Sequence, residues 1–282
     1  MTITVTGATG QLGRFVVAAL KRQGADVVAA VRDTAKGESL GVPARLADYD
    51  RPETLVPAFE GTDRLLFVSG SEAGRRVEQH RAVVEAAVKA GVGHIVYTSI
   101  TRADTSINPL APEHRATEEL IVASGLPYTF LRNNWYLENY TGNLGTALEH
   151  GVILGAAGDG RVAAATREDL AAGAAAVLTG DGHAGRIYET GGDVAFSMAD
   201  LAATITAQSG TEVAYRDLPE DDYAQALIGF GLPEGFARVL AAADTSIARG
   251  SLDVATGDLS RLIGRPTTTL AEAVTAALKQ RG

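Results

Sequence analysis

Short apolar runs alternate with longer amphipathic stretches along the first half of the chain. The apolar runs are rich in β-branched residues, as buried strands are, and they predict strands at 2–6, 26–32, 44–48, 64–69, 94–99 and 128–132. The amphipathic stretches between them predict helices at 11–23, 52–59, 75–90 and 112–124. Nearly continuous apolar strands separated by helices indicate a parallel sheet that is covered on both faces.

The rhythm changes after Arg132. We expect a helix at 134–150, strand-like pieces at 152–158 and 161–166, a helix at 168–178 and a strand at 186–190. Ser197 and Asp200 have the spacing of a capping box in front of a helix at 201–208. The remainder predicts a short strand at 212–215 and then mostly helices, the last at 270–279.

This pattern predicts an α/β protein with a Rossmann-type, doubly wound parallel sheet and a smaller, helix-rich C-terminal substrate domain. The length of 282 residues suits one large domain or two smaller ones. We expect a dinucleotide-binding domain at 1–132 and the substrate domain at 133–282, with the strand at 186–190 returning to the first sheet.

Composition narrows the classes of partner and site. With 46% hydrophobic and 21% charged residues, the chain can bury a core. The net charge of −9 disfavours nucleic acid and anionic membranes as general partners. Because there is no cysteine and the five histidines are scattered, we expect no disulfide and no metal site. The sequence shows neither a secretory signal nor a long apolar run, so we expect a cytoplasmic protein.

A glycine-rich segment, T-G-A-T-G-Q-L-G at 6–13, joins the first predicted strand to the first predicted helix. Gly7 suits a tight turn, Gly10 lets backbone N–H groups approach a pyrophosphate, and Gly13 permits close packing of the helix on the strand. A purely structural turn is the alternative. We expect a dinucleotide to be bound here by Gly7, Thr9, Gly10, Gln11 and Leu12.

Arg32, nineteen positions after Gly13, ends the second predicted strand, where the adenosine ribose is expected. An arginine there matches the 2′-phosphate of NADP, so NADP is favoured over NAD. Asp33 could accept from a ribose hydroxyl instead, and Arg32 could be an ordinary solvated charge. By position, Asp48 and Tyr49 are expected to meet the adenine, and Ser69, Gly70 and Ser71 to pass near the ribose.

Several segments give the chain a family resemblance that covers nearly its whole length. They are V-Y-T-S at 96–99, E-H at 113–114, P-Y-T-F-L-R-N at 127–133, W-Y at 135–136 and L-I-G at 262–264. Together with the glycine-rich segment, they resemble the NmrA-like group of atypical short-chain dehydrogenase/reductases. Within that group the resemblance is strongest to the NAD(P)H:quinone oxidoreductases and the triphenylmethane reductases.

The chain departs from ordinary short-chain dehydrogenases, which use a Ser, a Tyr and a Lys four residues after the Tyr. Ser99 stands in the place of the serine, but Leu110 and His114 stand where the tyrosine and the lysine would be. Because that tyrosine normally protonates the alkoxide, alcohol dehydrogenation is disfavoured. Quinones and cationic triarylmethane dyes remain as acceptors, since they can take a hydride without a strong protein acid.

The resemblance implies that the residues just after the sixth strand border the nicotinamide and the acceptor. We assign Asn133 and Asn134 to the cofactor, and Trp135 and Tyr136 to an aromatic shelf for a flat substrate. Plain packing of the two aromatic residues at the domain junction is the alternative. Tyr140, Phe230 and Phe236 are further substrate candidates by position, against the alternative that they belong to the core of the small domain.

His114, Ser99 and Tyr136 are the candidate catalytic residues. For His114 we consider a place near the nicotinamide ribose, proton donation, and a purely structural role. Ser99 could equally be a strand-end residue that bonds locally.

These observations predict a flavin-independent, NADPH-dependent reductase that transfers a hydride to a quinone or a related electrophilic aromatic acceptor. Two alternatives stay open: a pathway-specific reductase of an imine, enone or ketone, and a non-catalytic NADP-sensing regulatory protein. The sequence also leaves a homodimer open.

Overall fold

The core of the molecule is a seven-stranded sheet whose neighbouring strands all run parallel. The computed structural model describes residues 1–72 and 74–280. The order reverses direction at β1, as in Rossmann-type sheets, and the prediction of a doubly wound parallel sheet is confirmed. In sheet order the strands are β3 (Ala44–Leu46), β2 (Asp26–Val31), β1 (Thr2–Thr6), β4 (Arg64–Phe67), β5 (His94–Ile100), β6 (Tyr128–Asn133) and β9 (Arg186–Thr190).

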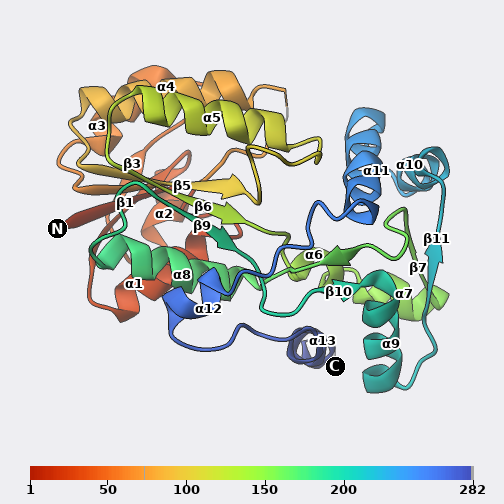
Figure 1. The fold of residues 1–282 in the computed structure, drawn as a ribbon. Coiled ribbons are helices and arrows are strands. Elements are labelled where there is room, and N and C mark those ends of the chain that lie inside the picture. The colour runs from red at the N-terminus through yellow and green to blue at the C-terminus, as the bar shows by residue number, and fades with distance from the viewer. Residues whose placement is uncertain (73, 281–282) are drawn as a thin grey trace.

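Helices cover both faces of the sheet (Figure 1). One layer consists of α3 (Leu55–Phe59), α4 (Arg76–Lys89) and α5 (Ala111–Ala123). The opposite layer consists of α1 (Gly13–Arg22), α8 (Arg167–Thr179) and α12 (Asp258–Ile263). Each layer buries its own apolar cluster against the sheet. The short helix α2 (Thr34–Glu38) was not predicted from the sequence. The helix predicted at 52–59 divides into the 3-10 turn η1 (Pro52–Thr54) and α3.

The second half of the chain supplies part of this sheet and its cover. β9 pairs with β6 from Thr129 opposite Arg186 to Asn133 opposite Thr190, which confirms the predicted return of 186–190. Leu170 and Leu178 of α8 join the same buried cluster as α1. The division of the chain at residue 132 therefore stays a proposal about folding units, since residues beyond it complete the nucleotide-type layer.

A second group of elements, called the small lobe below, lies beyond the carboxyl ends of the strands (Figure 1). Two small sheets pair β7 (Val152–Gly155) with β11 (Ala214–Asp217) and β8 (Arg161–Val162) with β10 (Phe196–Ser197). A third apolar cluster holds this group together. Its helices are α6 (Glu138–Thr141), α7 (Leu144–His150), α9 (Met198–Ser209), α10 (Glu220–Gly229), α11 (Glu234–Ala248) and α13 (Leu270–Lys279).

The single helix predicted at 134–150 is wrong. Residues 134–136 are not helical and form a bridge to Ala165: Ala165 N–H donates to Trp135 O at 3.1 Å, and Leu137 N–H, at the N-cap of α6, donates to Ala165 O at 2.9 Å. The helical part that follows is interrupted between α6 and α7 at Gly142 and Asn143, both poor helix formers. The strands expected at 152–158, 161–166 and 212–215 are shorter or shifted. The capping box predicted in front of α9 is confirmed.

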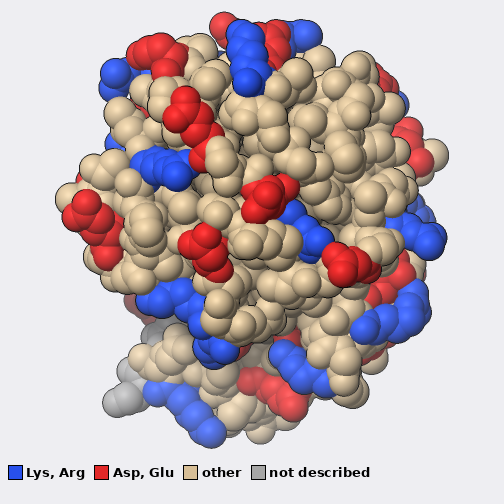
Figure 2. Space-filling view, turned by 90° about the vertical axis from the view of Figure 1, so that its left-hand side faces the viewer, with Lys and Arg blue, Asp and Glu red and all other residues tan. Residues whose placement is uncertain are grey.

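The face at the amino ends of the strands carries charges of both signs (Figure 2). Lys and Arg side chains are interspersed with Asp and Glu there. At the amino end of β4, the Arg64 guanidinium lies 2.8 Å from the Asp181 carboxylate. Within residues 1–72 and 74–280, none of the helices has the length and apolar character needed to cross a bilayer.

Candidate functional site

The glycine-rich loop leaves the carboxyl end of β1 and leads into the N-terminus of α1. Gly7 has a φ of +57° and accepts from Gly10 N–H at 2.8 Å. A Cβ on Gly13 would lie 2.3 Å from the Gly7 carbonyl oxygen, so only glycine fits there. No acidic residue stands in the first turn of α1, and its positive end suits the negative charge of a pyrophosphate. Leu12 packs into the core, and the exposed loop residues are Gly7, Thr9, Gly10 and Gln11.

Arg32 directly follows β2, and its side chain is exposed. The neighbouring Asp33 is the N-cap of α2: its Oδ1 accepts from the Lys36 backbone N–H at 3.3 Å, and its Oδ2 lies 3.7 Å from Lys36 Nζ. Capping engages the carboxylate that was the alternative partner for a ribose hydroxyl. Arg32 is therefore the side chain at this strand end that suits a 2′-phosphate.

Asp48 and Tyr49 follow β3 but point in different directions. Asp48 Oδ1 accepts from the Asp50 N–H at 3.2 Å in the exposed turn. The Tyr49 hydroxyl turns inward and lies 2.6 Å from Thr6 Oγ1 and 3.1 Å from the Val68 carbonyl oxygen. Burial raises the pKa of Tyr49 above its usual value. Tyr49 thus ties β1 to the segment after β4, and any contact that it makes with adenine would come from its ring.

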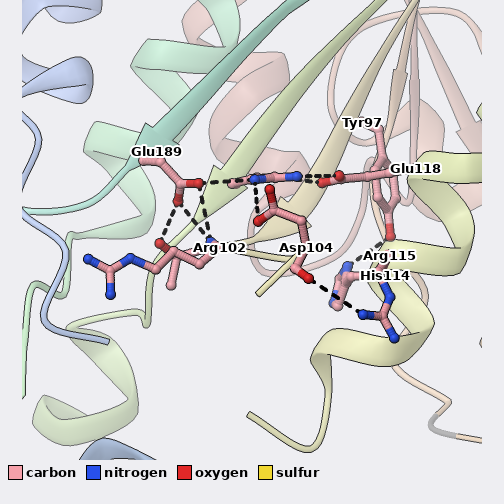
Figure 3. Close-up of polar contacts among 9 residues, drawn as sticks. Tyr97, Arg102, Asp104, His114, Arg115, Glu118 and Glu189 are labelled. Atoms are coloured by element: carbon pink, nitrogen blue, oxygen red, sulfur yellow. Dashed lines mark hydrogen bonds and ion pairs between the residues drawn. The ribbon is translucent and has the colours of Figure 1, made fainter. Parts of the chain in front are cut away.

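Tyr97 and Ser99 point to the same face of β5, because side chains alternate along a strand. The Tyr97 hydroxyl lies 2.8 Å from His114 Nδ1 on the first turn of α5 (Figure 3). Burial lowers the pKa of His114 well below its usual value, so the ring is neutral and is a poor acid. The Ser99 hydroxyl is buried and has no hydrogen-bond partner among the described residues, which leaves it for a bound ligand.

Arg132, the residue before Asn133, is buried, and three carboxylates that Figure 3 labels, those of Glu118, Asp104 and Glu189, lie around it. Its guanidinium lies 2.7 Å from Glu118, 3.0 Å from Asp104 and 3.3 Å from Glu189. Burial alone would lower the pKa of Arg132, but Glu118 and the other two carboxylates raise it above its usual value. The cluster joins α5, β6, β9 and the loop after β5.

Glu189 also fixes the loop after β5. Its carboxylate accepts from Thr101 Oγ1 at 2.6 Å and from the Arg102 backbone N–H at 3.0 Å (Figure 3). Arg102 has a φ of +49° and is the one non-glycine residue with a positive φ in the described part of the chain. That conformation costs about 1 kcal/mol, which the contacts with Glu189 offset. The backbone at Thr101 and Arg102, just after Ser99, is therefore tied to β9.

Asn133 and Asn134 hold neighbouring segments together at the end of β6. Asn133 Oδ1 accepts from Thr190 Oγ1 at 2.7 Å. Asn134 Nδ2 donates to Leu252 O at 3.0 Å, while its Oδ1 accepts from the Trp135 N–H at 2.7 Å. Both side chains thus set the path of the chain from the sheet into the small lobe. Their contact with the nicotinamide stays a prediction.

Three of the predicted substrate residues gather where β6 enters the small lobe. Trp135 is half-buried and packs against two apolar clusters, one beside β5 and one in the lobe. The Tyr136 ring lies 4.4 Å from the Arg167 guanidinium, and burial raises the pKa of Tyr136. The Tyr140 ring packs edge-on against Phe196 at 5.7 Å, and its buried hydroxyl has no partner among the described residues.

Phe230 and Phe236 do not belong to that packed group. They flank the turn between α10 and α11 and are 63% and 51% exposed. The structure does not include them in the buried cluster that holds Trp135 and Tyr140. Their contact with a substrate stays a prediction.

Sequence reasoning missed two kinds of residue at this site. Tyr97, the partner of His114, could have been found because it lies two positions before Ser99 on a strand. His80 lies on the buried face of α4 with Val83 and Val84. Its partner, the Gly70 N–H after β4, is distant in the sequence, so no local pattern predicts this hydrogen bond. Among residues 1–72 and 74–280, no group of three or more His, Asp or Glu side chains could hold a metal.

Comparisons with known proteins bear on this geometry. The NmrA-like family matches residues 1–270. Quinone oxidoreductase 2 of Escherichia coli (strain K12) is 49% identical over 277 residues, which cover 96% of this chain and 97% of that protein.

Two solved structures share the whole fold. The NADPH-dependent quinone oxidoreductase of Escherichia coli, in complex with NADPH, superposes with a TM-score of 0.95 at 48% identity, over 98% of this chain and 99% of that chain. The Citrobacter sp. triphenylmethane reductase, in complex with NADP(H), superposes with a TM-score of 0.93 at 39% identity, again over 98% and 99%.

Proposed function

The chain belongs to the NmrA-like family, and we propose that it is an NADPH-dependent reductase that transfers a hydride, without flavin, to a quinone or a related electrophilic aromatic acceptor. One observation carries this proposal: the chain has a glycine-rich loop at 7–13 that suits a pyrophosphate, but it has no strong acid at the position of the usual catalytic tyrosine. Leu110 and the neutral, buried His114 occupy the positions of the usual tyrosine and lysine. The relatives named for quinone and triphenylmethane reduction support the same choice of acceptor.

The residues present fit NADPH, which supplies the hydride when it is bound. The loop at 7–13 would hold the pyrophosphate, and Arg32 the 2′-phosphate. Asp48 would meet the adenine. Ser69, Gly70 and Ser71 would pass near the ribose. The residues near the nicotinamide would be Ser99, His114, Asn133 and Asn134. We place the enzyme in the cytoplasm, where NADPH is kept reduced.

The chain contributes mainly by positioning the acceptor. Trp135 and Tyr136 would offer it an aromatic surface, and the cluster around Arg132 keeps the surrounding backbone in place. A quinone that gains a hydride becomes a delocalised hydroquinone anion, which takes its proton from water. The unpartnered Ser99 hydroxyl would hydrogen-bond to the acceptor or to the nicotinamide.

Turnover by the purified protein tests this proposal. We expect oxidation of NADPH, followed by its absorbance, with benzoquinones, naphthoquinones and triarylmethane dyes in the absence of flavin, and slower oxidation of NADH. NADPH binding without turnover on any of these acceptors would contradict the proposal and favour the NADP-sensing alternative. Turnover only on imines or enones would favour the pathway-specific reductase.

A further inference from the structure

Three consecutive backbone N–H groups after β4, those of residues 68–70, donate to side chains of three different elements. The acceptors are, in order, Thr6 Oγ1 at 2.9 Å, Thr98 Oγ1 at 2.9 Å and His80 Nε2 at 3.0 Å. These N–H groups are therefore not available to a ligand. These bonds to the protein interior fix where this segment lies. The Ser69 hydroxyl donates to the Gly70 carbonyl oxygen at 3.3 Å, and Ser71 is exposed.

The hydrogen bonds of His80 have a determined direction. Because the Gly70 N–H can only donate, Nε2 accepts and carries no proton. Nδ1 therefore carries the proton and donates to Thr117 Oγ1 at 2.8 Å, whose own hydrogen goes to the Glu113 carbonyl oxygen at 2.9 Å. Burial, together with the nearby Arg76, lowers the pKa of His80 to about 3 and keeps the ring neutral.

Arg76 and Glu113 clamp the same loop at two points. Arg76 Nε donates to the Gly70 carbonyl oxygen at 2.9 Å, and its Nη1 donates to Glu113 Oε2 at 2.7 Å. The other carboxylate oxygen of Glu113 accepts from the Gly74 N–H at 2.8 Å. Glu113 directly precedes His114, so the first turn of α5 connects this loop to the candidate catalytic histidine.

We propose that His80, assisted by Arg76 and Glu113, is a positioning residue that sets the segment at 69–71 against a ribose of NADPH. This inference rests on the proposed function, which assigns that segment to the cofactor. His80 acts through Gly70 and does not itself touch the cofactor.

His94 offers a matched control at the opposite end of the sheet. Its Nε2 lies 2.9 Å from Thr129 Oγ1, and burial lowers its pKa as well. Thr129 Oγ1 donates to the His183 carbonyl oxygen at 2.7 Å, so this chain of hydrogen bonds joins β5, β6 and the turn before β9. Its loss should reduce stability without moving the cofactor.

The experiment compares NADPH binding by His80→Phe, His80→Gln and His94→Phe, measured by titration calorimetry. His80→Phe leaves the Gly70 N–H without an acceptor, and we expect NADPH to bind about tenfold more weakly. His80→Gln keeps an acceptor near the position of Nε2 and should restore most of the affinity. His94→Phe should lower the melting temperature and leave the affinity for NADPH unchanged.

Equal losses of NADPH affinity in His80→Phe and His94→Phe, or no restoration by His80→Gln, would overturn the proposal. If His80→Phe does not fold, Thr117→Val removes the acceptor of Nδ1–H with little change of volume and should also weaken NADPH binding. In the unaltered enzyme, nitrogen-15 NMR should find Nε2 of His80 unprotonated; a protonated Nε2 would contradict the assigned direction. The readout is NADPH binding and not turnover. A protein that binds NADPH but reduces no quinone would therefore refute the proposed reductase function, and the role of His80 in NADPH binding could still be tested.

Discussion

His94 and Arg64 stand at the amino end of the sheet, and His80 and Arg76 serve its carboxyl end with the same chemistry. In each pair a histidine bonds to a threonine, and an arginine donates to a backbone carbonyl oxygen at 2.9 Å. His80 is fully buried and His94 is half-buried. At the amino end these bonds connect strands and helices to one another. At the carboxyl end they support a loop. We infer that identical polar groups serve stability at one end and ligand placement at the other.

The unpaired polar groups show the same asymmetry. The two buried side-chain oxygens without a partner among the described residues belong to Ser99 and Tyr140, both on the carboxyl side of the sheet. At the amino end, Arg64 donates to the carbonyl oxygens of Leu178 and Gly180 and pairs with Asp181. Buried polar groups are rarely left unpaired unless a ligand or water uses them, so the asymmetry supports the proposal that the ligand binds at the carboxyl end.

The largest effect should come from the ion cluster at the carboxyl end. Arg132→Leu leaves Glu118, 8% exposed, without its cation, and we expect the free energy of unfolding to fall by about 4 kcal/mol. Arg64→Leu, whose partner Asp181 is 96% exposed, should cost about 2 kcal/mol, mainly through lost hydrogen bonds to carbonyl oxygens. Urea denaturation measures both. Equal losses would mean that the two ends are stabilised alike.

Gly13→Ala should have the next largest effect. The added Cβ meets backbone at 2.3 Å, which cannot give way as a side chain would, so we expect a loss of about 3 kcal/mol in stability and weaker NADPH binding. Gly24→Ala, past the other end of α1, has a φ of +71° and no atom within 4 Å. It should cost about 1 kcal/mol and leave NADPH binding intact. Thermal unfolding and calorimetric titration would show whether the two glycines differ in this way.

Arg32→Ala tests the specificity of the carboxyl end. We expect the binding of NADPH to weaken by about 2 kcal/mol because a charge-assisted contact with the 2′-phosphate is lost, while the binding of NADH stays the same. Asp33→Ala removes the N-cap of α2 and should cost about 1 kcal/mol of stability without changing the ratio of the two affinities. Titration with both cofactors decides, and equal weakening by Arg32→Ala would refute the 2′-phosphate role.

Acid should destabilise the protein partly through His80. In the folded state its pKa is about 3, below the value of 6.5 for an unperturbed histidine, so only the unfolded chain takes up this proton between pH 6.5 and 3. The contribution of His80 is complete above pH 6.5 and is lost as the pH falls, by about 1.4 kcal/mol per pH unit. Chemical denaturation from pH 7 to 5 should give a flatter dependence for His80→Phe. Parallel curves would show that His80 is not buried neutral.

Ser99→Ala should have the smallest effect on the empty protein. Because its hydroxyl has no partner among the described residues, we expect a change in stability of about zero. If the hydroxyl serves a ligand, the KM for NADPH or for the quinone should rise. A loss of stability with unchanged KM values would assign Ser99 to the structural class.

Local pattern was sufficient to predict the central sheet. Buried parallel strands are rich in apolar and β-branched residues, and such runs locate β1, β2, β4, β5 and β6. The edge strands β3 and β9 are less buried and carry weaker patterns. The glycine-rich loop was equally readable, since a strand, three spaced glycines and a helix define it. The error at 134–150 has a tertiary cause: the backbone of Trp135 and Leu137 bonds to Ala165, a contact that no local pattern records.

The positioning network escaped prediction for the same reason. Gly70, His80 and Glu113 come from three separate segments, and only the fold brings their hydrogen bonds together. The spacing of His80 from Val83 and Val84 indicates a buried face of a helix. It does not indicate which groups His80 meets there.

The return of β9 to the sheet also determines when the sheet can be completed during synthesis of the protein. Until Thr190 has left the ribosome, β6 is an unpaired edge whose N–H and C=O groups can pair with another chain. The apolar cluster on the α1 side still lacks the cover of α8 until Thr179 has emerged, and that of α12 until Ile263 has emerged. A nascent chain that stalls before β9 is therefore a target for chaperones and prone to aggregation, although its glycine-rich loop is among the first segments made.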